Sequence, residues 1–212
     1  MIQEMINGSI AVLTKPSAQT FEQHERDNLV WALIYAVIAS VINGILSAIT
    51  WPLQVGQIRA QLEAQNVPSD VIETTLAQQG NIINLVLSGI FSTIIGSLII
   101  WGLIYLLGRA FGGTGSFGEL AWGISLFSSP LSVAQTLASA IPLPLISGFI
   151  SLALTLYGVY LVYLAIQSGM NLPARKALYI AIILAIIAII FVCIAGTIIA
   201  AVSLALGGGF AP

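Results

Sequence analysis

The stretch LAWGISLFSSPLSVAQTLASAIPLPLISGFISLALTLYGVYLVYLAIQSGMNLPA, from Leu120 to Ala174, runs for 55 residues without a charged side chain. As one helix it would be about 80 Å long, against roughly 30 Å for a bilayer core. It therefore has to fold back on itself. The break is Ala140-Ile141-Pro142-Leu143-Pro144, because two prolines remove two amide donors and push the residue before each out of helical geometry. We expect two membrane spans here, near 119–140 and 144–167.

Three further charge-free stretches flank this one. They are 31, 35 and 36 residues long and cover 28–58, 74–108 and 177–212. Each holds one spanning helix of about 20 residues, so we expect spans near 29–50, 81–107 and 177–206. The runs are continuously apolar, whereas barrel strands alternate over about ten residues. The sequence thus predicts an all-α bundle of five transmembrane helices over residues 29–206.

Composition excludes other classes of protein. Hydrophobic residues make up 58% of the 212 residues and charged residues 7%, against about 25% charged in soluble domains. A soluble fold has no means of covering its surface with so few charges. A single Cys and a single His leave little for metal or redox chemistry, and the net charge of −2 gives no basic surface for nucleic acid. We expect no cofactor, no metal and no nucleic acid.

The basic residues predict the orientation of the chain. With five spans the termini lie on opposite sides of the membrane. One side carries only Arg59, and the other carries the remaining five Lys and Arg residues: Lys15, Arg26, Arg109, Arg175 and Lys176. The positive-inside rule then places the N-terminus in the cytoplasm and the C-terminus outside.

Two segments outside the spans show structure of their own. Residues 1–28 begin with apolar residues at helical spacing (Ile2, Met5, Ile6, Ile10, Leu13), typical of an interfacial helix on the cytoplasmic leaflet. The outer loop 51–80 has two apolar stripes separated by a helix start at Pro68, which predicts a helical hairpin capping the outer face. This hairpin is either a docking surface or a lid that only packs on the bundle. Residues 207–212 form a short outer tail.

The middle of each predicted span lacks Asp, Glu, Lys, Arg and His, which argues against an ion-coupled transporter. Small residues recur every four positions, as in Ser40-Gly44-Ala48, and let helices approach closely within one bundle or between protomers. Pro130 predicts a kink in the third span, with Ser128 or Ser129 bonding the freed carbonyl. Four tryptophans lie near span ends and are expected at the membrane interface: Trp31, Trp51, Trp101 and Trp122.

Four glycines between Gly108 and Phe117 resemble a phosphate-binding loop only superficially. No Lys-Ser/Thr follows them, and the element before them is a membrane helix rather than a strand. We expect these glycines to form a tight turn at the membrane surface. Arg109 and Glu119 flank the loop and are placed to pair across it, although an exposed pair adds little stability.

Four segments carry a pattern that extends over nearly the whole chain. They are the lead-in Leu13-Thr14-Lys15-Pro16 with Phe21, the loop from Gly112 to Phe117, the stretch from Gly123 to Pro130, and the loop from Gly169 to Ala177. In this order and spacing they resemble the Yip1 family of five-span membrane proteins, which have the same N-in, C-out topology. The positions that stand out as family-motif or structural residues are Pro16, Phe21, Gly112, Gly113, Gly115, Phe117, Gly123, Pro130, Arg175 and Lys176.

The resemblance implies a role in membrane trafficking or organisation. Eukaryotic members work in the Golgi and early secretory pathway, associate with lipidated small GTPases and help in vesicle formation. They carry a long cytoplasmic N-terminal domain with an acidic, Tyr/Pro-containing motif, where this chain has 28 residues without such a motif. The chain is similar to a minimal, prokaryotic type, which implies the cell membrane of a prokaryote. Small-GTPase binding rests on family analogy alone.

The resemblance and the lack of a catalytic pattern favour a non-enzymatic membrane scaffold or partner-binding protein, acting on the bilayer, other membrane proteins or itself. One alternative is a structural accessory subunit of a larger membrane complex. Another is a small transporter or lipid-handling protein, in which Pro130 and the Pro142/Pro144 break line a cavity. An enzyme has the least support. The residues able to supply acid, base or charged groups near the membrane surface are Glu22, His24, Glu25, Arg109 and Glu119, and nothing in their spacing requires them to come together.

Overall fold

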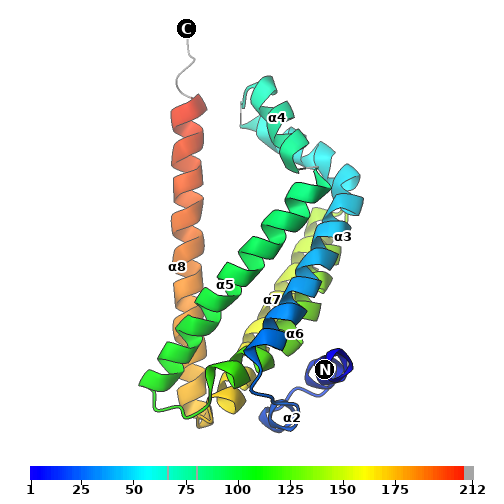
Figure 1. Cartoon of the computed structure of the whole chain (residues 1–212). Coiled ribbons are helices and arrows are strands. Elements are labelled where there is room, and N and C mark those ends of the chain that lie inside the picture. Colours follow the sequence, from blue (N-terminus) through cyan, green and yellow to red (C-terminus); the bar gives the residue numbers. More distant parts are fainter. Residues whose placement is uncertain (66, 80, 208–212) are drawn as a thin grey trace.

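The computed structural model describes residues 1–65, 67–79 and 81–207, so residues 208–212 of the predicted outer tail lie outside the described part. The described residues form α-helices and no strand. Figure 1 shows them: α1 (Ile2–Thr14), α2 (Ala18–Gln23), α3 (Leu29–Ala64), α4 (Ser69–Gln79), α5 (Ile82–Ala110), α6 (Phe117–Ser139), α7 (Pro144–Gly169) and α8 (Ala174–Gly207).

Four helices have the length and apolar composition needed to cross a membrane. The qualifying segments are Leu29–Gly56 in α3, Ile82–Ala110 in α5, Pro144–Gly169 in α7 and Ala174–Phe191 in α8. Their outer surfaces carry many exposed Ile, Leu and Phe side chains, such as Phe91, Phe149 and Phe191. Apolar surface of this extent suits contact with lipid. The chain is a multi-pass α-helical membrane protein.

Helix α6 covers the predicted third span but is less hydrophobic than these four helices and is not counted among them. It lies at the centre of the bundle, where it packs mainly against α3 and α7 and also touches α1 and α5. The run from Leu120 to Phe127 is buried throughout. Because protein rather than lipid surrounds much of α6, its side chains can be small and polar without facing hydrocarbon.

Helix α3 is longer than the predicted first span. It continues through Pro52 to Ala64 as one helix of 36 residues, about 54 Å at 1.5 Å per residue. The first arm of the predicted outer hairpin is therefore an extension of α3. Pro52 removes a single amide donor, and the helix re-forms on both sides of it. Helix α4 folds back on this extension, and Ile72 and Leu76, which form the second of the two predicted apolar stripes, are buried.

The small residues predicted on the first span serve packing within the bundle. A Cβ on Gly44 would lie 2.8 Å from Cγ2 of Val86, and one on Gly89 would lie 3.1 Å from Oγ of Ser40. Glycine at these positions lets α3 and α5 come together closely. Between α6 and α7, Gln135 donates from Nε2 to the Ser151 carbonyl at 3.2 Å.

The buried core lies at the end of the bundle that holds α1 and α2 (Figure 1). Trp101 and Trp122 belong to this core and are almost fully buried. Neighbouring helices therefore shield both side chains, and their expected depth at the membrane interface stays a prediction. Helices α1 and α2 pack over this end of α6 and α7, and such long-range covering leaves no mark in the local sequence pattern.

Candidate functional site

The lead-in turns sharply between α1 and α2 and then anchors on α6. Lys15 caps α1 and Pro16 follows it, and the Ser17 hydroxyl accepts a hydrogen bond of 3.0 Å from the Thr20 amide at the start of α2. Phe21 is buried with its ring edge-on to Phe127, at 6.1 Å between centroids. A serine cap and a buried aromatic residue on the next turn fix where this short helix sits.

Phe21 lies over Gly123. A Cβ added at Gly123 would stand 3.7 Å from Cδ1 of Phe21 and 4.0 Å from the Cβ of Ala165, both ordinary contact distances. The absence of a larger side chain at this position lets α2, α6 and α7 share one contact region. Two of the predicted motif residues, far apart in the sequence, thus lie together.

The loop from Phe111 to Gly118 interlocks with the loop from Gly169 to Lys176. The Thr114 amide donates to the Met170 carbonyl at 3.0 Å, and the Lys176 ammonium donates to the Phe111 carbonyl at 2.8 Å. Gly112 has φ +88°, a left-handed conformation that favours glycine. The glycines therefore form a tight turn, as their spacing predicts.

Gly113 and Gly115 allow the backbones of the two loops to touch. A Cβ on Gly113 would lie 2.9 Å from both the Gly108 and the Met170 carbonyl oxygens. A Cβ on Gly115 would collide with the carbonyl oxygen of Gly169. No side chain of any size fits between backbones at this distance, so the contact requires glycine.

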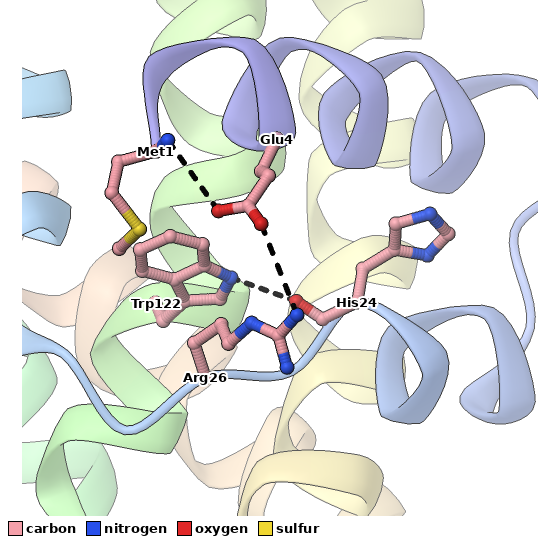
Figure 2. Close-up of polar contacts among 5 residues, drawn as sticks. All are labelled: Met1, Glu4, His24, Arg26 and Trp122. Carbon is pink, nitrogen blue, oxygen red and sulfur yellow. Dashed lines mark hydrogen bonds and ion pairs between the residues drawn. The ribbon is translucent and has the colours of Figure 1, made fainter.

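A third segment, residues 24–28, completes this arrangement. The Trp122 indole N–H donates to the His24 carbonyl at 2.8 Å (Figure 2). A Cβ on Gly118 would collide with the Asp27 carboxylate. We call residues 24–28, 111–118 and 169–176 the three-segment junction. It joins the lead-in, the α5–α6 loop and the α7–α8 loop at one end of the bundle.

Helix α1 is tied to the same end by charge. The Glu4 carboxylate lies 3.5 Å from the N-terminal amine and 4.0 Å from the Arg26 guanidinium, as Figure 2 shows. These groups are solvent-exposed, so each ion pair contributes little stability. Burial of Met5 and Val12 against the core holds α1 more strongly.

Glu25 is the electrostatically unusual residue of the junction. Its Oε1 is buried and has no hydrogen-bond partner among the described residues. Burial, together with the nearby carboxylates of Glu119 and Glu22, raises the pKa of Glu25 from 4.5 to about 7, and burial is the largest of these causes. Near neutral pH this side chain therefore exists in both protonation states.

The predicted Arg109–Glu119 pair does not form. Glu119 instead accepts from the Ser116 amide at 2.8 Å, while Ser116 Oγ accepts from the Glu119 amide at 3.1 Å. This reciprocal capping box begins α6 and occupies the carboxylate. Arg109 donates to the Gly113 carbonyl at 3.2 Å and so steadies the glycine turn.

A family model described as the Yip1 domain matches residues 10–207. The match takes in the whole three-segment junction and nearly all of the chain. The chain belongs to the Yip1 family. This confirms the predicted resemblance. No curated protein and no solved structure gives a significant match.

The other motif positions of this Yip1 chain have separate surroundings. The Phe117 ring stands edge-on to Tyr105 at 5.6 Å, which fixes the start of α6 against α5. Arg175 is exposed at the start of α8. Pro130 lies within α6, outside the junction. Of the two serines predicted to bond the carbonyl freed by Pro130, Ser129 does not, because its hydroxyl has no partner in the described structure.

Sequence reasoning missed several residues of the Yip1 junction. The Gly169 loop was noted as part of the family pattern, but not the close contact of Gly169 itself, where a Cβ would lie 2.9 Å from the Leu120 Cα. Gly118 is another missed residue. A glycine is unusual in the first turn of a helix that begins with a strong N-cap, and this could have drawn attention to it. Met170 is fully buried and its side chain fills the space beside Gly108.

The junction of this Yip1 protein is built mainly from backbone contacts. Within the described residues no three His, Cys, Asp or Glu side chains are grouped to hold a metal ion. The His24 ring is bonded through Nδ1 to the Thr20 carbonyl at 2.9 Å. Such an arrangement fixes three chain segments relative to one another, and it presents the exposed Arg175 and Arg26 from a rigid base.

Proposed function

We propose that this Yip1 protein is a non-enzymatic membrane scaffold, which binds other membrane proteins or further copies of itself at the end of the bundle that holds the three-segment junction. Its fixed backbone geometry supports this proposal, because a rigid surface loses little conformational freedom on binding. The scaffold acts in the cell membrane of a prokaryote.

The proposal includes a five-span topology in which α6 is the fifth span. Helix α6 has 23 residues, about 35 Å at 1.5 Å per residue, which is enough to cross a bilayer. Its neighbours α3 and α7 are both candidate spans, and α6 runs alongside them (Figure 1). Its lower hydropathy fits its central place, where neighbouring helices shield it from lipid.

In the proposed orientation of the chain in the membrane, the junction lies in the cytoplasm. Five of the six Lys and Arg residues lie at the junction end, whereas Arg59 lies beside α4 at the opposite end. The five are Lys15 and Arg26 on either side of α2, Arg109 in the last turn of α5, and Arg175 and Lys176 in the first turn of α8. This asymmetry supports a cytoplasmic N-terminus. The Arg59 guanidinium is engaged locally by Glu73 at 2.8 Å.

Helix α1 provides the observation that carries the proposal. One face, with Met5, Gly8, Ser9 and Val12, is buried against the bundle. The other face exposes Ile2, Ile6 and Ile10, which are 45%, 46% and 57% exposed. Spacing of four residues makes these three side chains one apolar stripe. A helix that is docked on protein and apolar on its free face suits the inner leaflet or a membrane-embedded partner.

A mild-detergent pull-down of the tagged protein, followed by native mass spectrometry, tests this function. We expect recovery as a homo-oligomer or with a membrane-protein partner. Ile6→Glu is expected to weaken that association, whereas Thr14→Glu, an exposed polar position on the same helix, is expected to leave it intact. A strictly monomeric protein without partners would contradict the proposal. Fixed stoichiometry within a large complex would make it an accessory subunit instead.

A further inference from the structure

A cavity of about 410 Å³ lies between α3, α5 and α6, away from the three-segment junction. Its lining combines apolar residues such as Trp101 and Phe127 with small polar ones. The polar side chains come from all three helices and include Ser40, Asn43, Thr93, Ser97, Ser129 and Ser132. A concentration of hydroxyl groups at one place in a membrane bundle is costly unless they are satisfied.

The cavity lies at mid-depth of the spans. Ser40 and Asn43 are near the middle of the candidate span Leu29–Gly56, and Ser97 is near the middle of Ile82–Ala110. Ser129 is near the middle of α6. The lining therefore meets the hydrocarbon region of a bilayer rather than its polar surface.

Ser129 is the residue that points to a ligand. It is only 4% exposed, it lines the cavity, and its hydroxyl has no hydrogen-bond partner within the described part of the chain. Neighbouring polar side chains, in contrast, form hydrogen bonds with each other. Asn43 donates from Nδ2 to Ser132 Oγ at 3.0 Å, and Thr136 Oγ1 donates to Asn43 Oδ1 at 3.1 Å. The Ser129 hydroxyl thus has no protein partner but is closed off from the cavity space, so a bound molecule reaches it only when the Ser129 side chain rotates toward the cavity.

The chemistry of the lining selects an uncharged ligand. None of the described lining residues is Asp, Glu, Lys, Arg or His. A charged headgroup would lose its hydration here without gaining an opposite charge, at a cost of several kcal/mol. A hydroxyl or an ester carbonyl, in contrast, is matched by serine hydroxyls in a low-dielectric site.

The opening of the cavity favours entry from the bilayer. Ser92 and Ile100 line it and are exposed on the surface of α5 that faces the surroundings of the bundle. The volume is in the range of ligand sites, roughly 300–1,000 Å³. It accommodates the polar end of a lipid with the start of a chain, while the rest of the chain stays in the membrane.

We propose that this cavity binds the hydroxyl- and ester-bearing end of an uncharged lipid of the diacylglycerol class. The Ser129 hydroxyl donates to an ester carbonyl or accepts from the lipid hydroxyl, and the acyl chains leave through the opening beside α5. This binding site goes beyond the scaffold function and does not depend on any protein partner.

Photolabelling of the full-length protein tests the site. The protein is reconstituted in phosphatidylcholine vesicles that contain a diacylglycerol with a diazirine near its glycerol end. We expect saturable labelling of α5 and α6 peptides that line the cavity. Unlabelled diacylglycerol should compete, and phosphatidic acid with the same chains should not. Non-saturable labelling spread over the outer faces of α7 and α8, as expected of a cavity that holds only water, would overturn the proposal. Equal competition by phosphatidic acid would overturn it too.

Three variants sharpen the test. Ser129→Ala removes one hydroxyl and leaves no protein group unpaired, so folding is retained, and half-saturation should need about tenfold more lipid. Ser139→Ala is the matched control, because its hydroxyl lies on the same helix but is exposed and bonds the Thr136 carbonyl. Gly96→Leu fills the cavity from a position where an added Cβ meets nothing within 4 Å, and should abolish saturable labelling. An unchanged Ser129→Ala, or an equal loss in Ser139→Ala, would contradict the proposal.

Discussion

The Trp122 indole N–H donates a hydrogen bond of 2.8 Å to the backbone carbonyl of His24, across 98 residues of sequence (Figure 2). Trp122 is only 1% exposed, so this bond is shielded from water. It joins the lead-in to the central helix α6 at the point where the chain turns toward α3. Two further hydrogen bonds join the N-terminal segment to the bundle, between Ser9 and Tyr35 at 2.9 Å and from the Tyr157 hydroxyl to the Leu13 carbonyl at 2.6 Å, but both are on the α1 side of Pro16.

We predict that Trp122→Phe frees this segment without unfolding the bundle. Phenylalanine keeps most of the buried ring but leaves the His24 carbonyl without its donor, which costs about 1–2 kcal/mol. Limited trypsin digestion in detergent should cut faster after Arg26. The control is Trp31→Phe, because the Trp31 indole makes no hydrogen bond within the described residues. Equal acceleration in both variants would contradict the prediction.

Gly115→Ala is predicted to disrupt the junction. The new methyl group would collide with the Gly169 carbonyl oxygen, and separating the two backbones should cost at least about 2 kcal/mol. Thermal unfolding in detergent should show a clearly lower midpoint. Gly102→Ala, where a Cβ meets nothing within 4 Å, should change stability by less than about 0.5 kcal/mol. A wild-type midpoint for Gly115→Ala would show that the two loops are not in contact.

Glu25 makes stability depend on pH in a defined direction. Its pKa in the folded protein is about 7, above the ordinary value of 4.5, so folding favours the protonated form. The contribution of this group is fully present below about pH 4.5 and is lost as pH rises through 7. Glu25→Gln should therefore stabilise the protein at pH 8 relative to wild type and flatten the change between pH 5 and 8.

The measurement for Glu25 is the thermal midpoint at both pH values for wild type and Glu25→Gln. Other carboxyl groups also titrate, so the difference between the two proteins isolates the Glu25 contribution. Asp70→Asn, on α4 at the opposite end of the molecule, is the control for a change of charge alone. The same pH slope in wild type and Glu25→Gln would refute the prediction.

Apolar burial rather than charge is predicted to hold α4 on the extension of α3. The Arg59–Glu73 pair is close, at 2.8 Å, but exposed, and such a pair contributes under about 1 kcal/mol. Leu76 is buried, and truncating a buried leucine costs about 2 kcal/mol or more. Hydrogen exchange of Ser69–Gln79 should thus accelerate strongly in Leu76→Ala and little in Arg59→Gln. The reverse order would identify the ion pair as the main contact.

Local physics made much of this architecture predictable. Lipid imposes helices on long charge-free runs, so the helical stretches and the Pro142/Pro144 break follow from the sequence. The turn at Gly112 follows from the local glycine pattern. The partners of that turn do not, because Gly169 and Met170 lie more than 50 residues away and nothing local marks their approach.

The features that the sequence did not reveal arise from long-range packing. Trp101 and Trp122 lie near predicted span ends, and helices far away in the sequence bury both side chains in the core. Pro52 has the look of a helix end, yet α3 continues through it. Ser128 or Ser129 was expected to bond the carbonyl freed by Pro130, but the Ser129 hydroxyl is buried without a partner in the described structure.

The length of α3 makes it a lever between the two ends of the molecule. This single helix begins after its N-cap residue Asn28 in the junction and ends where α4 packs against it. A rod of about 54 Å that tilts by 10° moves its far end by about 9 Å. Pro52, where one backbone hydrogen bond is missing, is the natural joint in this rod. A partner that shifts α3 at the junction end therefore displaces helix α4 at the other end of the molecule.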